Sequence, residues 1–191
     1  ALRLVDGHGD GLPRFNLERF GDRVRASGAP EQAALLPLLQ ARFERLYWRF
    51  GHDIAGAPDA GAIEIEEGGL RYGLQLTGQR NTGIFLDGRP ARAWVRAHSE
   101  GARVLNLFAY TCGFGMAAAA GGARSTTNVD AVPGVLARGR ENYARNQLAH
   151  DTRSFWRSDV FEALKRSRRS GARFEGIVLD PPPQASGGGR G

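Results

Sequence analysis

A glycine-containing turn and three aspartates stand at the ends of predicted strands of this 191-residue chain. The turn is Tyr110–Gly115, and the aspartates are Asp130, Asp159 and Asp180. A glycine turn between a strand and a helix lets the backbone approach a ligand, and the helix N-terminus offers unpaired N–H groups. An ionised aspartate about 20 residues further on can accept two hydrogen bonds from the cis-diol of a ribose. The pattern therefore predicts an enzyme that holds an adenosine-containing cofactor.

Structural roles for the same residues stay open. Gly113 and Gly115 also fit a packing turn, and Asp130 also fits the N-cap of a helix over 133–147. Asp159 fits either an acceptor for the adenine amine or an N-cap, and one residue can do both. The functional and structural roles differ in the partner of the side chain, which is a ligand in the first case and the protein's own backbone or core in the second.

The corner Asp180-Pro181-Pro182 is the predicted substrate side of the site. Proline rings fix φ and remove N–H donors, so the loop is rigid and its carbonyl groups are aimed. A rigid acidic corner beside a cofactor suits a planar substrate, whereas the alternative is an ordinary loop after a strand.

The elements that would position these residues alternate between strand and helix from residue 103 onward. We predict strands over 103–108, 125–130, 154–157 and 174–179, with helices over 114–121, 133–147 and 160–168. Such alternation predicts an α/β fold with a parallel sheet covered on both faces. Ligands bind outside the carboxyl ends of the strands of such a sheet, which is where the turn and the aspartates lie.

The N-terminal part reads differently. Residues 1–28 have the turns and alternation of short strands, and residues 30–50 have apolar residues at helical spacing, including the aromatic Phe43, Tyr47, Trp48 and Phe50. These aromatics fit packing against the main domain better than a base-stacking platform. A linker over 51–61 precedes a hairpin, and a helix follows Asp87 with Trp94 and Val95 on its inner face.

We therefore divide the chain into four parts. They are an N-terminal linker and helical appendage (1–60), a β-hairpin with a lead-in helix (61–98), a cofactor-binding core (99–183) and a flexible tail (184–191). The appendage makes the expected fold class an α/β core with a small N-terminal α+β part.

Composition narrows the class of partner. A net charge of +6 favours RNA or DNA, although a solvated basic surface is the alternative, because Lys165 is the sole lysine among many arginines. No apolar run reaches the roughly 18 residues that span a bilayer, and the N-terminus lacks a signal-peptide pattern, so we expect a cytoplasmic protein without a membrane partner. The single Cys112 fits a reducing compartment, and no zinc-ligand spacing occurs.

Several motifs together resemble class I S-adenosylmethionine-dependent methyltransferases, in particular the bacterial 23S rRNA cytosine-C5 branch. The motifs are Asn106–Phe114, Asn128–Asp130, Asp180–Pro182 and Asn81–Arg89, the last resembling the branch's Thr-Gly-x-Phe-Leu-Asp-x-Arg element. The resemblance covers nearly the whole chain. It implies a Rossmann-like methyltransferase core, S-adenosylmethionine as cofactor, and a base in ribosomal RNA as substrate.

The resemblance also implies roles for individual residues. Asp180, Pro181 and Pro182 would face the target base as the catalytic corner. Asp130 would hold the ribose and Asp159 the adenine. The other cofactor-binding residues would be Thr82, Phe85, Arg89, Asn106, Phe108, Tyr110, Thr111, Gly113 and Val160. A homodimer is one assembly that the sequence leaves open.

The chain departs from the family pattern in two places. Pro183-Gln184 stands where the motif usually continues with Ser-Phe, and the family's sheet has more strands than the four predicted here, so the core is expected to be C-terminally truncated. Transfer to cytosine C5 needs a thiolate that attacks C6, and Cys112 lies in the cofactor turn, where small size explains it. Transfer to an amine would need no cysteine.

Two rival functions remain. The first is a catalytically incomplete module that keeps the cofactor or RNA surface. The second is a nucleotide-dependent oxidoreductase, against which the missing G-x-G-x-x-G spacing argues.

Overall fold

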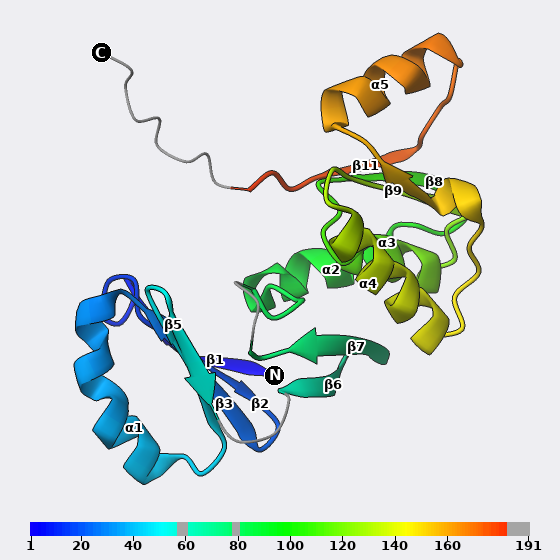
Figure 1. Cartoon of the computed structure of the whole chain (residues 1–191). Coiled ribbons are helices and arrows are strands. Elements are labelled where there is room, and N and C mark those ends of the chain that lie inside the picture. Colours follow the sequence, from blue (N-terminus) through cyan, green and yellow to red (C-terminus); the bar gives the residue numbers. More distant parts are fainter. Residues whose placement is uncertain (57–60, 78–80, 183–191) are drawn as a thin grey trace, which may run out of the picture. The chain divides into compact units, whose positions relative to one another are not determined.

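A computed structural model describes residues 1–56, 61–77 and 81–182. The chain forms two compact units, Ala1–Arg89 and Pro90–Gly191, and each is described by itself (Figure 1). No helix among the described residues is both long and apolar enough to cross a bilayer.

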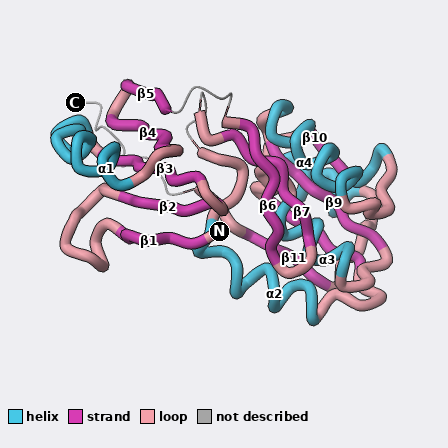
Figure 2. Tube along the Cα trace, turned by 90° about the horizontal axis from the view of Figure 1, so that it is seen from below, coloured by secondary structure: helices cyan, strands magenta, loops and turns pink. Residues whose placement is uncertain are grey.

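A five-stranded sheet dominates the first unit, with its strands side by side in chain order (Figure 2). The strands are β1 (Leu2–Asp6), β2 (Asn16–Phe20), β3 (Arg23–Gly28), β4 (Leu46–Phe50) and β5 (Asp53–Gly56). Only β3 and β4 pair in parallel, and the segment η1 (Pro30–Leu35) with α1 (Leu36–Arg42) connects them. The predicted strands in 1–28 are therefore confirmed.

The prediction of a helix through residue 50 is wrong, because residues 46–50 form β4. Leu46 and Phe50 lie on one face of either a helix or a strand, so their spacing does not separate the two structures. Parallel pairing with β3, from Val24–Leu46 to Gly28–Phe50, decides for the strand. Both side chains are buried in the hydrophobic core of this sheet, against which Phe43 and Trp48 also pack. The aromatic residues therefore pack within the first unit, and their predicted packing against the main domain stays a prediction.

The predicted linker over 51–61 contains β5, and residues 57–60 lie outside the described structure. The predicted hairpin is confirmed as β6 (Ala62–Glu67) and β7 (Leu70–Gln75). Its turn places Gly68 at φ 58° and Gly69 at φ 76°, the left-handed pair that a tight hairpin favours.

The second unit contains the predicted parallel sheet, in the order β10-β9-β8-β11. Its strands are β8 (Arg103–Leu107), β9 (Ser125–Asp130), β10 (Phe155–Arg157) and β11 (Gly176–Leu179). The helices are α3 (Gly113–Ala120), α4 (Pro133–Arg145) and α5 (Val160–Arg169), with η3 (Thr152–Ser154) before β10. Helix α5 covers one face, and α3 and α4 cover the other (Figure 1). The doubly wound α/β core is therefore confirmed.

The predicted helix after Asp87 exists, and Val95 is half-buried in it, but the prediction that Trp94 lies on its inner face is wrong. Asp87 lies in η2 (Leu86–Gly88), and the helix is α2 (Arg89–Ala97). Trp94 is 63% exposed and stacks on His98, whereas Arg92 is buried. The Arg92 guanidinium lies over the Phe114 ring, 6.0 Å from its centroid, so a cation–π contact accompanies the burial of this arginine.

Candidate cofactor-binding site

Strand order brings the predicted site residues to one edge of the second unit. The turn follows β8, Asp130 ends β9, Asp159 follows β10 and Asp180 follows β11. Since all four strands are parallel, these ends lie in a row along the carboxyl edge of the sheet. The chain passes from β8 to β9 and β10 on one side and then crosses to β11 on the other side, so the strand order reverses at β8. Ligands bind at such a point in open α/β sheets.

The turn after β8 has an unusual backbone. Phe108, Tyr110 and Cys112 have φ values of 54°, 50° and 63°, although none is glycine. Each costs about 1–2 kcal/mol relative to an ordinary conformation. Backbone hydrogen bonds hold the turn, including one from Cys112 N–H to the Ala109 carbonyl at 2.7 Å. Strain of this kind concentrates at ligand sites.

Asp130 is oriented by two backbone donors. Its Oδ2 accepts from the N–H of Tyr110 and its Oδ1 from the N–H of Val132, both at 2.9 Å. The side chain does not cap α4, whose N-cap is Val132 and has no side-chain hydrogen bond. The half-buried carboxylate keeps lone pairs for a further donor, such as a ribose hydroxyl.

Helix α3 begins directly after the strained turn. Its N-cap, Cys112, makes no side-chain hydrogen bond to the first turn. N–H groups at such a helix start favour anionic ligand atoms, for example a carboxylate. Gly113 opens this helix, and the neighbouring Thr111 is buried.

Gly115 has a packing role. A Cβ added there would lie 2.0 Å from Oδ1 of Asn128 and 2.7 Å from the hydroxyl of Tyr143. Asn128 also accepts from Nδ2 of Asn106 at 2.9 Å and donates to the Tyr143 hydroxyl at 3.1 Å. Asn106 thus belongs to a buried polar network beneath the site, and its predicted cofactor contact stays a prediction. The network residues Asn128 and Tyr143 were not predicted.

Asp159 is the N-cap of α5. Its Oδ1 accepts from the N–H groups of Phe161 at 2.8 Å and Glu162 at 3.3 Å. The capping alternative is therefore confirmed, while the adenine contact stays a prediction. The Val160 side chain packs in the core with Leu105 and Leu107.

The predicted catalytic corner follows the edge strand of the described sheet. Leu179 pairs with Leu107, so Asp180 comes next to the start of the β8 turn. Asp180, Pro181 and Pro182 are all exposed, and Pro183 lies outside the described residues. The corner is accessible to a large substrate.

Three predicted cofactor residues belong to the first unit. Thr82 is buried and donates to the Ile84 carbonyl at 3.3 Å, whereas Phe85 is 44% exposed. Arg89 Nε donates to Glu67 at 3.0 Å, and its guanidinium also reaches the Ala1 carbonyl. Their closure of a cofactor pocket stays a prediction.

Cys112 is fully buried beneath the turn. Burial, and secondarily the charge of Asp130, raise the pKa of its thiol far above the ordinary value. A thiol held in its neutral form is a poor nucleophile. No cluster of His, Cys, Asp and Glu in the described part of the chain could hold a metal ion.

Comparison with known proteins defines the class of protein. A model of the S-adenosylmethionine-dependent methyltransferase family matches residues 30–189, and the chain belongs to that family. The ribosomal RNA large subunit methyltransferase I of Salmonella arizonae is 36% identical over 95% of this chain. The protein of the same name from Cronobacter sakazakii is 35% identical over the same share. The chain spans about half the length of these curated relatives, 50% and 51% respectively.

Solved structures agree with this assignment. A proposed SAM-dependent methyltransferase from Streptococcus mutans superposes with a TM-score of 0.83 and 30% identity, covering 94% of this chain and 51% of that one. A proposed methyltransferase complexed with SAH superposes with a TM-score of 0.81 over the same shares at 30% identity. The oriented carboxylate of Asp130, the strained turn and the start of α3 are the features of this edge that could hold a cofactor.

Proposed function

We propose that this chain binds S-adenosylmethionine at the carboxyl edge of the second unit and takes part in methyl transfer to a base in ribosomal RNA. The cofactor would supply an electrophilic methyl group. The relatives named as ribosomal RNA methyltransferases, similar over 95% of the chain, carry the proposal for the substrate.

In this proposal Asp130 accepts hydrogen bonds from the ribose, and the turn residues Phe108, Tyr110 and Thr111 with Gly113 hold the methionine end. Asp159 and Val160 lie beside the adenine. Such contacts act by positioning the cofactor and the base for in-line transfer.

Asp180, Pro181 and Pro182 would orient the target base. Their exposure at the carboxyl end of β11, one residue beyond the pair Leu179–Leu107, supports this role. An amine target needs no cysteine. A cytosine-C5 target would need a thiolate other than the buried Cys112.

Substitution of Asp180 tests the proposal. Asp180→Ala should leave the affinity for S-adenosylmethionine unchanged within about twofold and abolish transfer of labelled methyl groups to bulk ribosomal RNA, because only the base loses its partner. Glu141→Ala, an exposed carboxylate on α4, is the matched control and should retain both. Persistent transfer by Asp180→Ala would refute the catalytic corner.

A module that binds without turnover is the second candidate. The share of the relatives that the chain spans supports it, because the chain covers only 50% of the length of the Salmonella arizonae protein. Tight binding of S-adenosylmethionine with no methyl transfer to RNA by the unmodified protein would favour this candidate.

The proposal includes a location and an assembly. The protein would act in the cytoplasm, because its proposed substrate is ribosomal RNA. The proposed assembly is a homodimer, which would give twice the chain mass of 20.7 kDa in light scattering.

A further inference from the structure

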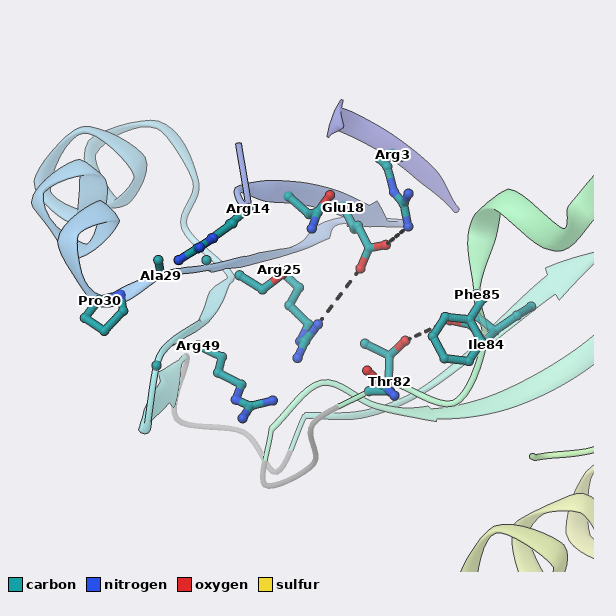
Figure 3. Close-up of a pocket in the computed structure, with 15 residues that line it drawn as sticks. Arg3, Arg14, Glu18, Arg25, Ala29, Pro30, Arg49, Thr82, Ile84 and Phe85 are labelled. Atoms are coloured by element: carbon teal, nitrogen blue, oxygen red, sulfur yellow. Dashed lines mark hydrogen bonds and ion pairs between the residues drawn. The ribbon is translucent and has the colours of Figure 1, made fainter. Parts of the chain in front are cut away.

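The first unit contains a basic pocket, and its wall includes Thr82 and Phe85, two of the predicted cofactor residues. Its volume is about 560 Å³, and its lining includes four arginines and one glutamate (Figure 3). These are Arg3, Arg14, Arg25, Arg49 and Glu18. All five come from the N-terminal sheet and its loops, and Thr82, Ile84 and Phe85 form the opposite wall (Figure 3).

Strand alternation explains why arginines gather on this face. In β3, Val24 and Ala26 enter the hydrophobic core, so Arg25 between them faces the other way. Glu18 pairs with Arg25 across β2 and β3, and Arg3 pairs with Glu18 across β1 and β2. Arg49 of β4 is the register partner of Ser27, which also lines the pocket. The register therefore builds a row of charge across the sheet.

Positive charge exceeds negative charge in this row. Glu18 is the shared partner of Arg3, at 3.2 Å, and of the buried Arg25, at 4.0 Å. Asp6 pairs with Arg3 as well, at 3.2 Å, whereas Arg14 and Arg49 add two further positive charges to the pocket. The Nε atoms of Arg3 and Arg49 are buried and have no hydrogen-bond partner among the described residues. Buried cationic donors are costly without an acceptor, so the pocket is suited to an anion.

Phe85 adds a second feature to the wall of the pocket. It is 44% exposed and lies across the pocket from Arg25 and Arg49 (Figure 3). An exposed aromatic ring in the same pocket as arginines suits a nucleotide, because the guanidinium fork matches a phosphate and the ring can stack on a base. The ligand that satisfies both features is a phosphorylated nucleoside unit.

We propose that this pocket holds a backbone phosphate of the RNA substrate on Arg25 and Arg49, with the adjoining base against Phe85. The proposal rests on the proposed RNA methyltransferase function. It adds a binding site in the first unit to the transfer site in the second.

The test is RNA binding by Arg49→Gln, compared with Arg42→Gln, an exposed arginine of α1 that does not line the pocket. Both variants lose one charge from the same unit. With a fluorescent oligonucleotide of ribosomal RNA sequence, Arg49→Gln should weaken binding about tenfold. It should also reduce the slope of log K against log salt by about 0.7–0.9, as loss of one phosphate contact predicts. The affinity for S-adenosylmethionine should stay unchanged in both variants.

Equal losses in Arg49→Gln and Arg42→Gln would overturn the pocket while leaving the proposed function intact. Should Arg49→Gln fold poorly by thermal melting, Arg49→Lys replaces it, with Arg42→Lys as its control. Arg49→Lys keeps the cation but loses the bidentate fork, so it should still weaken RNA binding. RNA binding without methyl transfer would overturn the function and leave the pocket. Inorganic phosphate or a mononucleotide that displaces the RNA at micromolar concentration would assign the pocket to a free phosphate ligand and overturn the RNA assignment.

Discussion

The backbone N–H of Tyr110 donates a hydrogen bond of 2.9 Å to Oδ2 of Asp130. The other oxygen of the same carboxylate accepts from the N–H of Val132, just before α4. Asp130 therefore joins the strained turn to the segment just before α4. Its oxygens retain lone pairs that can accept a hydrogen bond from a ligand.

Asp130→Ala should weaken binding of S-adenosylmethionine about 10- to 150-fold, because a charge-assisted hydrogen bond contributes about 1.5–3 kcal/mol. Isothermal titration measures the loss. Asp130→Asn keeps one acceptor oxygen and should give an intermediate value. Glu141→Ala is the control, and unchanged affinity in Asp130→Ala would exclude the ribose contact.

Gly115→Ala should destabilise the protein by about 1–3 kcal/mol, since the new methyl group would overlap Asn128 and Tyr143. Gly134→Ala is the matched control, because a Cβ there meets nothing within 4 Å and the residue lies in α4. It should be neutral or stabilising by up to about 1 kcal/mol. Denaturant unfolding compares the two, and equal stabilities would contradict the packing role of Gly115.

Cys112 should react slowly with iodoacetamide in the folded protein and quickly after denaturation. Its thiol is buried, and burial raises its pKa, so the thiolate stays scarce even at about pH 9. Cys112→Ala should retain methyl transfer. Fast native-state alkylation, or loss of transfer with cofactor binding intact, would restore the thiol as a candidate nucleophile.

The ion pair of Arg103 and Glu175 should make stability depend on acid pH. Hydrogen bonds from Arg103 lower the pKa of Glu175 from 4.5 to about 2. A depressed pKa in the folded state means that the stabilisation is present above the unfolded value of 4.5 and is lost as pH falls toward 2. Both side chains are solvent-exposed, so the effect is modest.

The corresponding measurement is the melting temperature of the wild type and Glu175→Gln at about pH 6 and about pH 2.5. The wild type should melt higher at the first pH, and the difference should shrink at the second. A difference that is the same at both values would show that Glu175 does not titrate as proposed. Lys165→Gln, whose partner Glu162 shares the surface of α5, serves as an unrelated surface-pair control.

The methyltransferase core could be predicted from the sequence because its signals are local. The strands and helices of the second unit alternate in a regular order along the chain, and each aspartate stands at or within two residues of the end of the strand that positions it. The parallel sheet then requires the ends to share one edge. The Asp159 N-cap shows the limit of this inference, because the same position fits a cap and a ligand contact.

In the first unit, short apolar segments do not by themselves distinguish a helix from a strand. The apolar residues of 46–50 have a spacing that fits either structure, and pairing with β3 decides for the strand. Trp94 likewise fitted the inner face of a helix by sequence. In the structure Trp94 is exposed, and Arg92 is the buried residue of this helix, with a cation–π contact to Phe114.

The sequence by itself determined the order of strand, turn and helix, the acids at the strand ends and the family that these motifs resemble. These properties depend on residues close together in the chain. Tertiary structure alone decided that Gly115 packs on Asn128 and Tyr143, that Cys112 is sealed from solvent, and that Arg25 and Arg49 line one pocket. Those outcomes depend on strand register and on contacts between residues distant in sequence, which no local pattern encodes.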